Sequence, residues 1–172
     1  MELHHPHHPT HKNNLMLILI TAAVMLSPAD GFMGTWKQNM AKSTYSPGPA
    51  PKSATYTHTQ DGDWVIQKCD FINAEGKLIS TTTRFKRDGK EYPYTSFSGA
   101  QKTITSKRIN ARTNEAMVKY GTEKETVRDV LSADSKTITR TITGTDTKGQ
   151  QISESQVYEK QDLLAPTIPP KF

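Results

Sequence analysis

The sequence has one cysteine, Cys69, among its 172 residues. A single cysteine excludes an intramolecular disulfide bond, and no Cys/His cluster has the spacing of a structural zinc site. The chain also has no glycine-rich phosphate loop and no pair of carboxylates at a spacing typical of catalysis. We therefore expect the protein to need neither a metal nor a cofactor.

Long hydrophobic runs are also lacking, with one exception. Leu15 to Leu26 form a twelve-residue apolar run without a charge, and Lys12 precedes it. Spanning a bilayer takes about 20 residues, so this run is too short for a transmembrane helix and suits a signal peptide. The small residues that follow predict cleavage after Ala29 or Gly31. We expect residues 1–29 to be a signal peptide and the mature protein to be secreted or periplasmic.

Histidine is concentrated in the tract HHPHHPTH, which lies ahead of the apolar run. Such a tract can bind metals, but here it would leave with the signal peptide. His58 is the only histidine that remains. A Ser-His-Asp or Cys-His arrangement would have to use it, in a threonine-rich segment with no nucleophile elbow nearby. The sequence therefore favours a binding protein over an enzyme.

Hydrophobic residues make up 34% of the chain and aromatic residues 8%. About 140 residues remain after cleavage, enough for one domain. Short alternating segments rich in threonine follow one another, with a turn every eight to twelve residues or so, which is typical of a β-barrel or sandwich. No segment after the apolar run has the 3.6-residue periodicity of an amphipathic helix. A small core with many threonines favours a barrel with a polar interior.

The turn signals divide the domain into ten predicted strands. Residues 39–53 are expected to be an irregular linker that contains Pro47, Pro49 and Pro51, and 162–172 a proline-rich flexible tail. The predicted strands are Gly34–Gln38, Ala54–Thr59, Trp64–Ile72, Lys77–Lys86, Lys90–Phe97, Lys102–Ile109, Glu115–Tyr120, Glu123–Leu131, Thr137–Thr143 and Gln150–Lys160.

The segment Gly31–Lys37 contains Phe32-x-Gly34-x-Trp36, which resembles the signature that opens the fatty-acid-binding proteins. Its Gly-x-Trp part is shared with lipocalins. The resemblance implies an all-β, antiparallel up-and-down barrel of eight to ten strands over residues 30–161. It also implies a small hydrophobic or amphipathic ligand inside the barrel and a structural role for Trp36 at the closed end. The family's helical lid has no counterpart here, so the mouth is either open or covered by the proline loop.

The same resemblance implies site residues. The segment Val127–Leu131 resembles the stretch that holds the family's inner arginine, which places Arg128 in the lumen. Tyr158 matches the tyrosine of the closing Arg-x-Tyr pair, and Gln156 replaces the arginine of that pair. Period-two alternation puts Gln156 and Tyr158 on one face of their strand. We expect Arg128, Tyr158, Gln156 and Arg140 to bind the ligand. Arginines at such a site would suit a ligand with an anionic head group.

Two other interpretations remain open. Arg128, Glu154 and Tyr158 would form a satisfied polar cluster if side chains fill the barrel, and the protein would then be an envelope or interaction module. A lipocalin-type isomerase or cyclase is the second alternative. The volume of the lumen distinguishes a carrier from a filled module.

Charge is uneven along the chain. Residues 77–112 carry nine basic residues against Asp88 and Glu91. This segment predicts a basic surface that would attract an anionic membrane. Export and the lack of a recognised motif argue against nucleic acid, and we expect a monomer.

Overall fold

The computed structural model describes residues 1, 30–96 and 100–162. Apart from Met1, the predicted signal peptide lies outside the described residues, and so does its histidine tract. The predicted tail lies outside them from residue 163 onward. No described helix is long and apolar enough to cross a bilayer.

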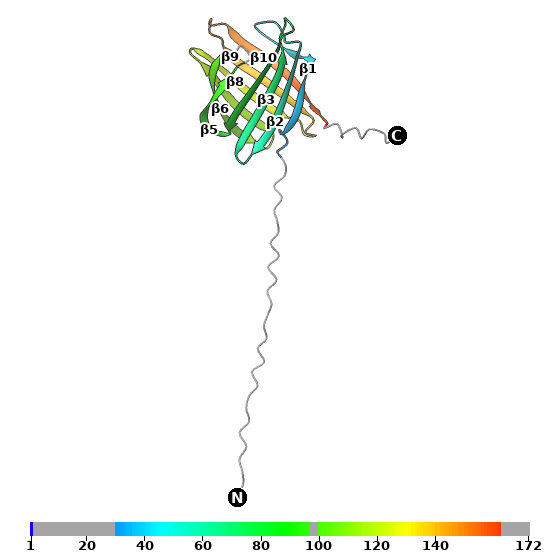
Figure 1. Cartoon of the computed structure of the whole chain (residues 1–172), viewed down its shortest axis with the longest axis vertical. Coiled ribbons are helices and arrows are strands. Elements are labelled where there is room, and N and C mark those ends of the chain that lie inside the picture. The colour runs from blue at the N-terminus through cyan, green and yellow to red at the C-terminus, as the bar shows by residue number, and fades with distance from the viewer. Residues whose placement is uncertain (2–29, 97–99, 163–172) are drawn as a thin grey trace, which may run out of the picture.

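The described part of the chain forms ten strands in one antiparallel sheet (Figure 1). The strands are β1 (Gly34–Thr44), β2 (Ser53–Asp61), β3 (Trp64–Ile72), β4 (Leu78–Lys86), β5 (Asp88–Thr95), β6 (Gln101–Asn110), β7 (Thr113–Tyr120), β8 (Glu123–Leu131), β9 (Thr137–Thr145) and β10 (Gln151–Gln161). The all-β prediction is confirmed, and nine of the ten predicted strands end within about two residues of the observed ones.

Successive strands pair with each other except for β4 and β5, and the first strand β1 also pairs with the last strand β10. The strand order is β4-β3-β2-β1-β10-β9-β8-β7-β6-β5, so β4 and β5 are the two edges of a nearly closed barrel. Tight turns hold the register of the hairpins. Gly62 and Gly121 each have φ of 56° in two-residue turns, a left-handed conformation that glycine adopts without strain.

Strand β1 continues past the predicted end at Gln38, so the linker prediction is wrong for residues 39–44. Local side-chain bonds hold this extension. The Asn39 Oδ1 accepts a bond from the Lys42 backbone N–H at 3.2 Å, and the Ser43 hydroxyl donates to the Asn39 carbonyl at 2.8 Å. The pairing register with β10 shifts between Asn39 and Thr44. Hydrogen bonds between local polar side chains give no hydrophobic pattern in the sequence, so this extension of β1 was not predicted.

The closed end of the barrel is built around Trp36 and Phe32, which are 1% and 0% exposed. The indole Nε1 of Trp36 donates to the Phe32 carbonyl at 3.0 Å, and His58 Nδ1 lies 3.2 Å from the same oxygen. Leu131 and Ile138 belong to the same buried cluster. The predicted burial of Trp36 is confirmed.

Residues 30–33, here called the N-terminal plug, are held at this end by ion pairs as well. Asp30 pairs with Arg87 at 2.7 Å and also with Arg108. Burial acts to raise the pKa of Asp30, but the Phe32 N–H and the two guanidinium groups outweigh it and hold that pKa below its usual value. Both guanidinium groups also lie over the Phe32 ring, at 5.8 and 5.0 Å. The plug therefore ties the segment before β1 to Arg87, between β4 and β5, and to Arg108 of β6.

Candidate functional site

The barrel encloses a cavity of about 310 Å³, within the range of small-ligand sites. Apolar and aromatic side chains form much of its wall because alternate residues of each strand point inward. They are Ala54, Tyr56, Phe71, Phe85, Tyr94, Ile104, Ala116, Val118, Val127, Ile142, Ile152 and Tyr158. The lumen is therefore open space and not filled by side chains.

The loop between β1 and β2 forms part of the cavity wall. Tyr45, Pro49 and Pro51 from this loop line the cavity. The Ser153 N–H of β10 donates to the Ser46 carbonyl at 2.7 Å, which fastens the loop to the barrel. The proline loop therefore contributes to the wall of the cavity, and whether it covers the mouth stays a prediction.

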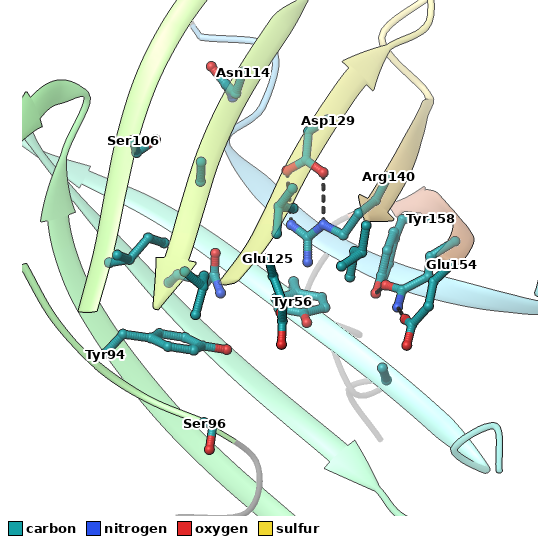
Figure 2. A pocket seen from close by; sticks show the side chains of 18 of the residues that line it. Tyr56, Tyr94, Ser96, Ser106, Asn114, Glu125, Asp129, Arg140, Glu154 and Tyr158 are labelled. Atoms are coloured by element: carbon teal, nitrogen blue, oxygen red, sulfur yellow. Dashed lines mark hydrogen bonds and ion pairs between the residues drawn. The ribbon is translucent and has the colours of Figure 1, made fainter. Parts of the chain in front are cut away.

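Arg140 and Asp129 form a buried ion pair in the cavity (Figure 2). Nε and Nη2 of the arginine donate to the two carboxylate oxygens at 2.7 and 2.9 Å, a bidentate arrangement. The guanidinium carbon lies 4.6 Å from the centre of the Tyr56 ring and 5.4 Å from that of Tyr158. Burial disfavours the charged arginine, but Asp129 outweighs it and raises the Arg140 pKa. Arg140 therefore lines the lumen, as predicted, but its guanidinium is already paired with the Asp129 carboxylate.

Three consecutive inward residues of β10 form a hydrogen-bonded row. The Tyr158 hydroxyl donates to the Gln156 Oε1, and the Gln156 amide donates to Glu154, both at 2.6 Å. Burial raises the pKa of the Tyr158 hydroxyl. All three residues line the cavity, which confirms the predicted face of this strand. Ligand contact by Tyr158, Gln156 and Arg140 stays a prediction.

Arg128 does not face the cavity, so its predicted place in the lumen is wrong. Its side chain is 53% exposed and lies 3.7 Å from Glu115 on the neighbouring strand β7. The residues of β8 that point inward are Glu125, Val127, Asp129 and Leu131. Because alternate residues face opposite sides, burying Leu131 forces Arg128 outward.

Substituting Arg128 by leucine should change the free energy of unfolding by less than about 0.5 kcal/mol, because exposed ion pairs contribute little. Urea unfolding measures this. Arg140→Leu is the matched comparison, because it removes the same group from the lumen and should be far more damaging. A loss of several kcal/mol for Arg128→Leu would contradict the outward placement.

A second charged cluster, missed by sequence reasoning, lies in the wall. Lys102 contacts Glu123 and lies 3.4 Å from Glu125. Burial and the bond with Glu123 raise the pKa of Glu125 to about 7, although Lys102 opposes the shift. Burial also acts to raise the pKa of Glu123, but its bonds with Glu125 and Lys102 outweigh this and lower it. The i, i+2 spacing of the two glutamates was the available signal, because it places them on one face.

Two buried amide oxygens that sequence reasoning also missed have no hydrogen-bond partner within the described ranges. They are the Oε1 of Gln38 and the Oδ1 of Asn114. Both residues line the cavity, and they are only 5% and 8% exposed. Buried polar atoms are normally satisfied, so each unpaired oxygen marks a place where a donor fits.

The candidate nucleophile and base are engaged elsewhere. Cys69 is 1% exposed, and burial raises the pKa of its thiol to about 12. His58 is bonded through Nε2 to Gln67 at 3.1 Å, and burial lowers its pKa. Within residues 30–96 and 100–162, no three His, Cys, Asp or Glu side chains are placed to hold a metal ion.

Ion pairs reduce the free positive charge of segment 77–112. Five of its nine basic residues have carboxylate partners: Arg84, Lys86, Arg87, Lys102 and Arg108. Contact of this segment with an anionic membrane stays a prediction.

The chain matches no family model and no curated protein sequence. Solved structures do resemble it. A fatty acid binding protein of Schistosoma mansoni in complex with arachidonic acid superposes with a TM-score of 0.56 at 17% identity, over 77% of this chain and 97% of that one. As-p18, an extracellular fatty acid binding protein, gives 0.52 at 16% identity, over 77% and 97%. Zebrafish ileal bile acid-binding protein complexed with cholic acid gives 0.50 at 14% identity, over 76% and 99%.

These matches extend over nearly the whole length of the other proteins. They show that the described domain has the fold of the fatty-acid-binding proteins and related calycins, as the opening signature indicated. At these identities the likeness concerns the fold alone.

Proposed function

We propose that this fatty-acid-binding-protein-like barrel binds a small hydrophobic or amphipathic ligand in its lumen. The observation that carries the proposal is the cavity of about 310 Å³, whose wall combines apolar and aromatic side chains with polar and charged ones. Such a lining favours ligand binding because apolar surface leaves water while the polar groups fix orientation. A barrel filled by its own side chains, the interaction-module alternative, would have no such space.

The structural neighbours support the same ligand class. Two of them are fatty acid binding proteins, and the third is a bile acid-binding protein complexed with cholic acid. Binding without catalysis fits the state of Cys69 and His58, neither of which is free to act as a nucleophile or base. We further propose that the protein works outside the cytoplasm, on the basis of the apolar run at Leu15–Leu26 and the small residues after it. One of the neighbours is itself described as extracellular.

A substitution that fills the lumen tests the proposed site. Ile142 of β9 lines the cavity, whereas Thr141 beside it is exposed on the outer face. Ile142→Trp should weaken binding of the apolar dye Nile red at least about tenfold, since the indole takes the space of the ligand. Fluorescence titration measures the affinity.

Thr141→Trp is the matched control and should bind the dye like the unaltered protein. Far-UV circular dichroism checks that both variants fold, because overpacking costs about 1–3 kcal/mol. Equal dye affinity in both variants would show that the lumen is not the site. If only Ile142→Trp loses the dye, native mass spectrometry of protein purified from its source, followed by lipid extraction, would identify the natural ligand.

A further inference from the structure

The cations that line the cavity are all committed to carboxylates of the protein. The three pairs within the described residues are Arg87–Asp30, Lys102–Glu123 and Arg140–Asp129. An anionic head group would meet one of these carboxylates beside every cation that lines the cavity, and the like charges would repel each other. The lumen is therefore poorly suited to a ligand carboxylate.

Two acceptor groups on one part of the cavity wall remain available by contrast. Glu154 lines the cavity and receives the Gln156 amide at 2.6 Å. The Oε1 of Gln38 is unpaired, and the Gln38 side chain is almost completely buried. The amide nitrogen of Gln38 donates to the Tyr45 hydroxyl and, at 3.3 Å, to Ser43. The Gln38 Oε1 and the Glu154 carboxylate can accept further bonds, whereas the Tyr45 hydroxyl keeps its own proton to donate.

Tyr45 bonds to Gln38 and also lies within electrostatic range of Glu154. Burial raises the pKa of Tyr45 to about 12, and the negative charge of Glu154 contributes to the shift although the Gln38 bond opposes it. Gln38 is also the register partner of Tyr158, which bonds to Gln156 beside Glu154. The Glu154 carboxylate and the Gln38 oxygen thus belong to one wall, formed by β1, β10 and the loop after β1. Figure 2 shows Glu154 and Tyr158 on this wall beside the Asp129–Arg140 pair.

We propose that the cavity takes an amphipathic amine, with its ammonium group held by the Glu154 carboxylate and the Gln38 Oε1 and its hydrocarbon part on the apolar lining. This inference rests on the proposed function and adds the head-group class. An ammonium group has three donors and no acceptor, which complements this wall. The bond to the carboxylate is charge-assisted and so among the stronger ones.

The electrostatics of Glu154 agree with this assignment. Burial raises its pKa, and the Gln156 amide and the distant charge of Arg140 only partly compensate. The empty cavity therefore holds a carboxyl group that is costly to ionise. A bound cation would reverse that cost, whereas a bound carboxylate would increase it.

Three ligands with the same hydrocarbon chain test the head-group class. Decylamine, decanol and decanoate compete with Nile red for the full chain at pH 7.5, where the amine is cationic and the acid anionic. We expect decylamine to bind at least about tenfold more tightly than decanoate. Glu154→Gln should lower the affinity for decylamine at least about tenfold, the size expected for a hydrogen bond to a charged group. The affinity for decanol should change by less than about twofold.

Glu159→Gln is the matched control. It removes a carboxylate from the same strand, but from an exposed pair with Lys42, so all three affinities should persist. Decanoate or decanol binding as tightly as decylamine would overturn the amine assignment while leaving the carrier function intact. An unchanged decylamine affinity in Glu154→Gln would overturn it equally. Failure of Nile red and all three compounds to bind would overturn the carrier function itself.

Discussion

Asp129→Leu should reduce the free energy of unfolding by about 3–5 kcal/mol, because it leaves the Arg140 guanidinium buried without its partner. The two side chains are only 12% and 10% exposed, and they share two hydrogen bonds. Against a typical domain stability of about 5–15 kcal/mol, this loss is severe. Urea unfolding followed by circular dichroism measures it.

Two further variants isolate the cause. Asp70→Leu removes a carboxylate from an exposed pair with Lys68 on β3 and should cost less than about 1 kcal/mol. Combining Asp129→Leu with Arg140→Met should recover most of the stability, because apolar residues replace both buried charges. An Asp129→Leu cost as small as that of Asp70→Leu would show that water solvates the guanidinium in the lumen.

Trp36→Ala should cost about 3–5 kcal/mol, the range for losing a large buried aromatic side chain. The indole is 1% exposed, bonds to the plug through Phe32 and lies under the Lys160 ammonium at 5.0 Å. Its removal opens a cavity at the closed end and frees the Phe32 carbonyl from one of its bonds. Thermal and urea unfolding both report the change.

Trp64 provides the comparison. It is half-buried on the outer face, where Arg84 and Lys86 cover its ring, so Trp64→Ala should cost less. In the Trp64→Phe variant the remaining fluorescence comes from Trp36 and should resist quenching by acrylamide. Quenching as efficient as that of free tryptophan would contradict the closed end described here.

The fold was predictable because its signals are local and repeated. Turn residues at regular spacing marked nine of the ten strands closely, and the opening signature placed Trp36 correctly. Side-chain facing was predictable only where alternation is regular. On β10 the resemblance pointed Tyr158 inward, and period-two alternation then put Gln156 on the same face, as observed.

On β8 the sequence pattern is ambiguous because Val127, Val130 and Leu131 do not share one face. Choosing the face by resemblance put Arg128 inward, whereas the burial of Leu131 puts Asp129 there. The Asp129–Arg140 pair was therefore missed, since it depends on the register between two strands. The unpaired Gln38 and Asn114 oxygens depend on three-dimensional packing and leave no mark in the sequence.

The pairing of β1 with β10 joins the first and last strands of the barrel, so it cannot form until the whole domain has been synthesised. Asn39 on β1 bonds to Glu159 on β10 across 120 residues of chain. Chains are synthesised at about 5–20 residues per second, so β10 is made on the order of ten seconds after β1. Contacts this distant in sequence also form slowly once the chain is complete. Until this last strand emerges, the barrel wall lacks the strand that carries Glu154, Gln156 and Tyr158.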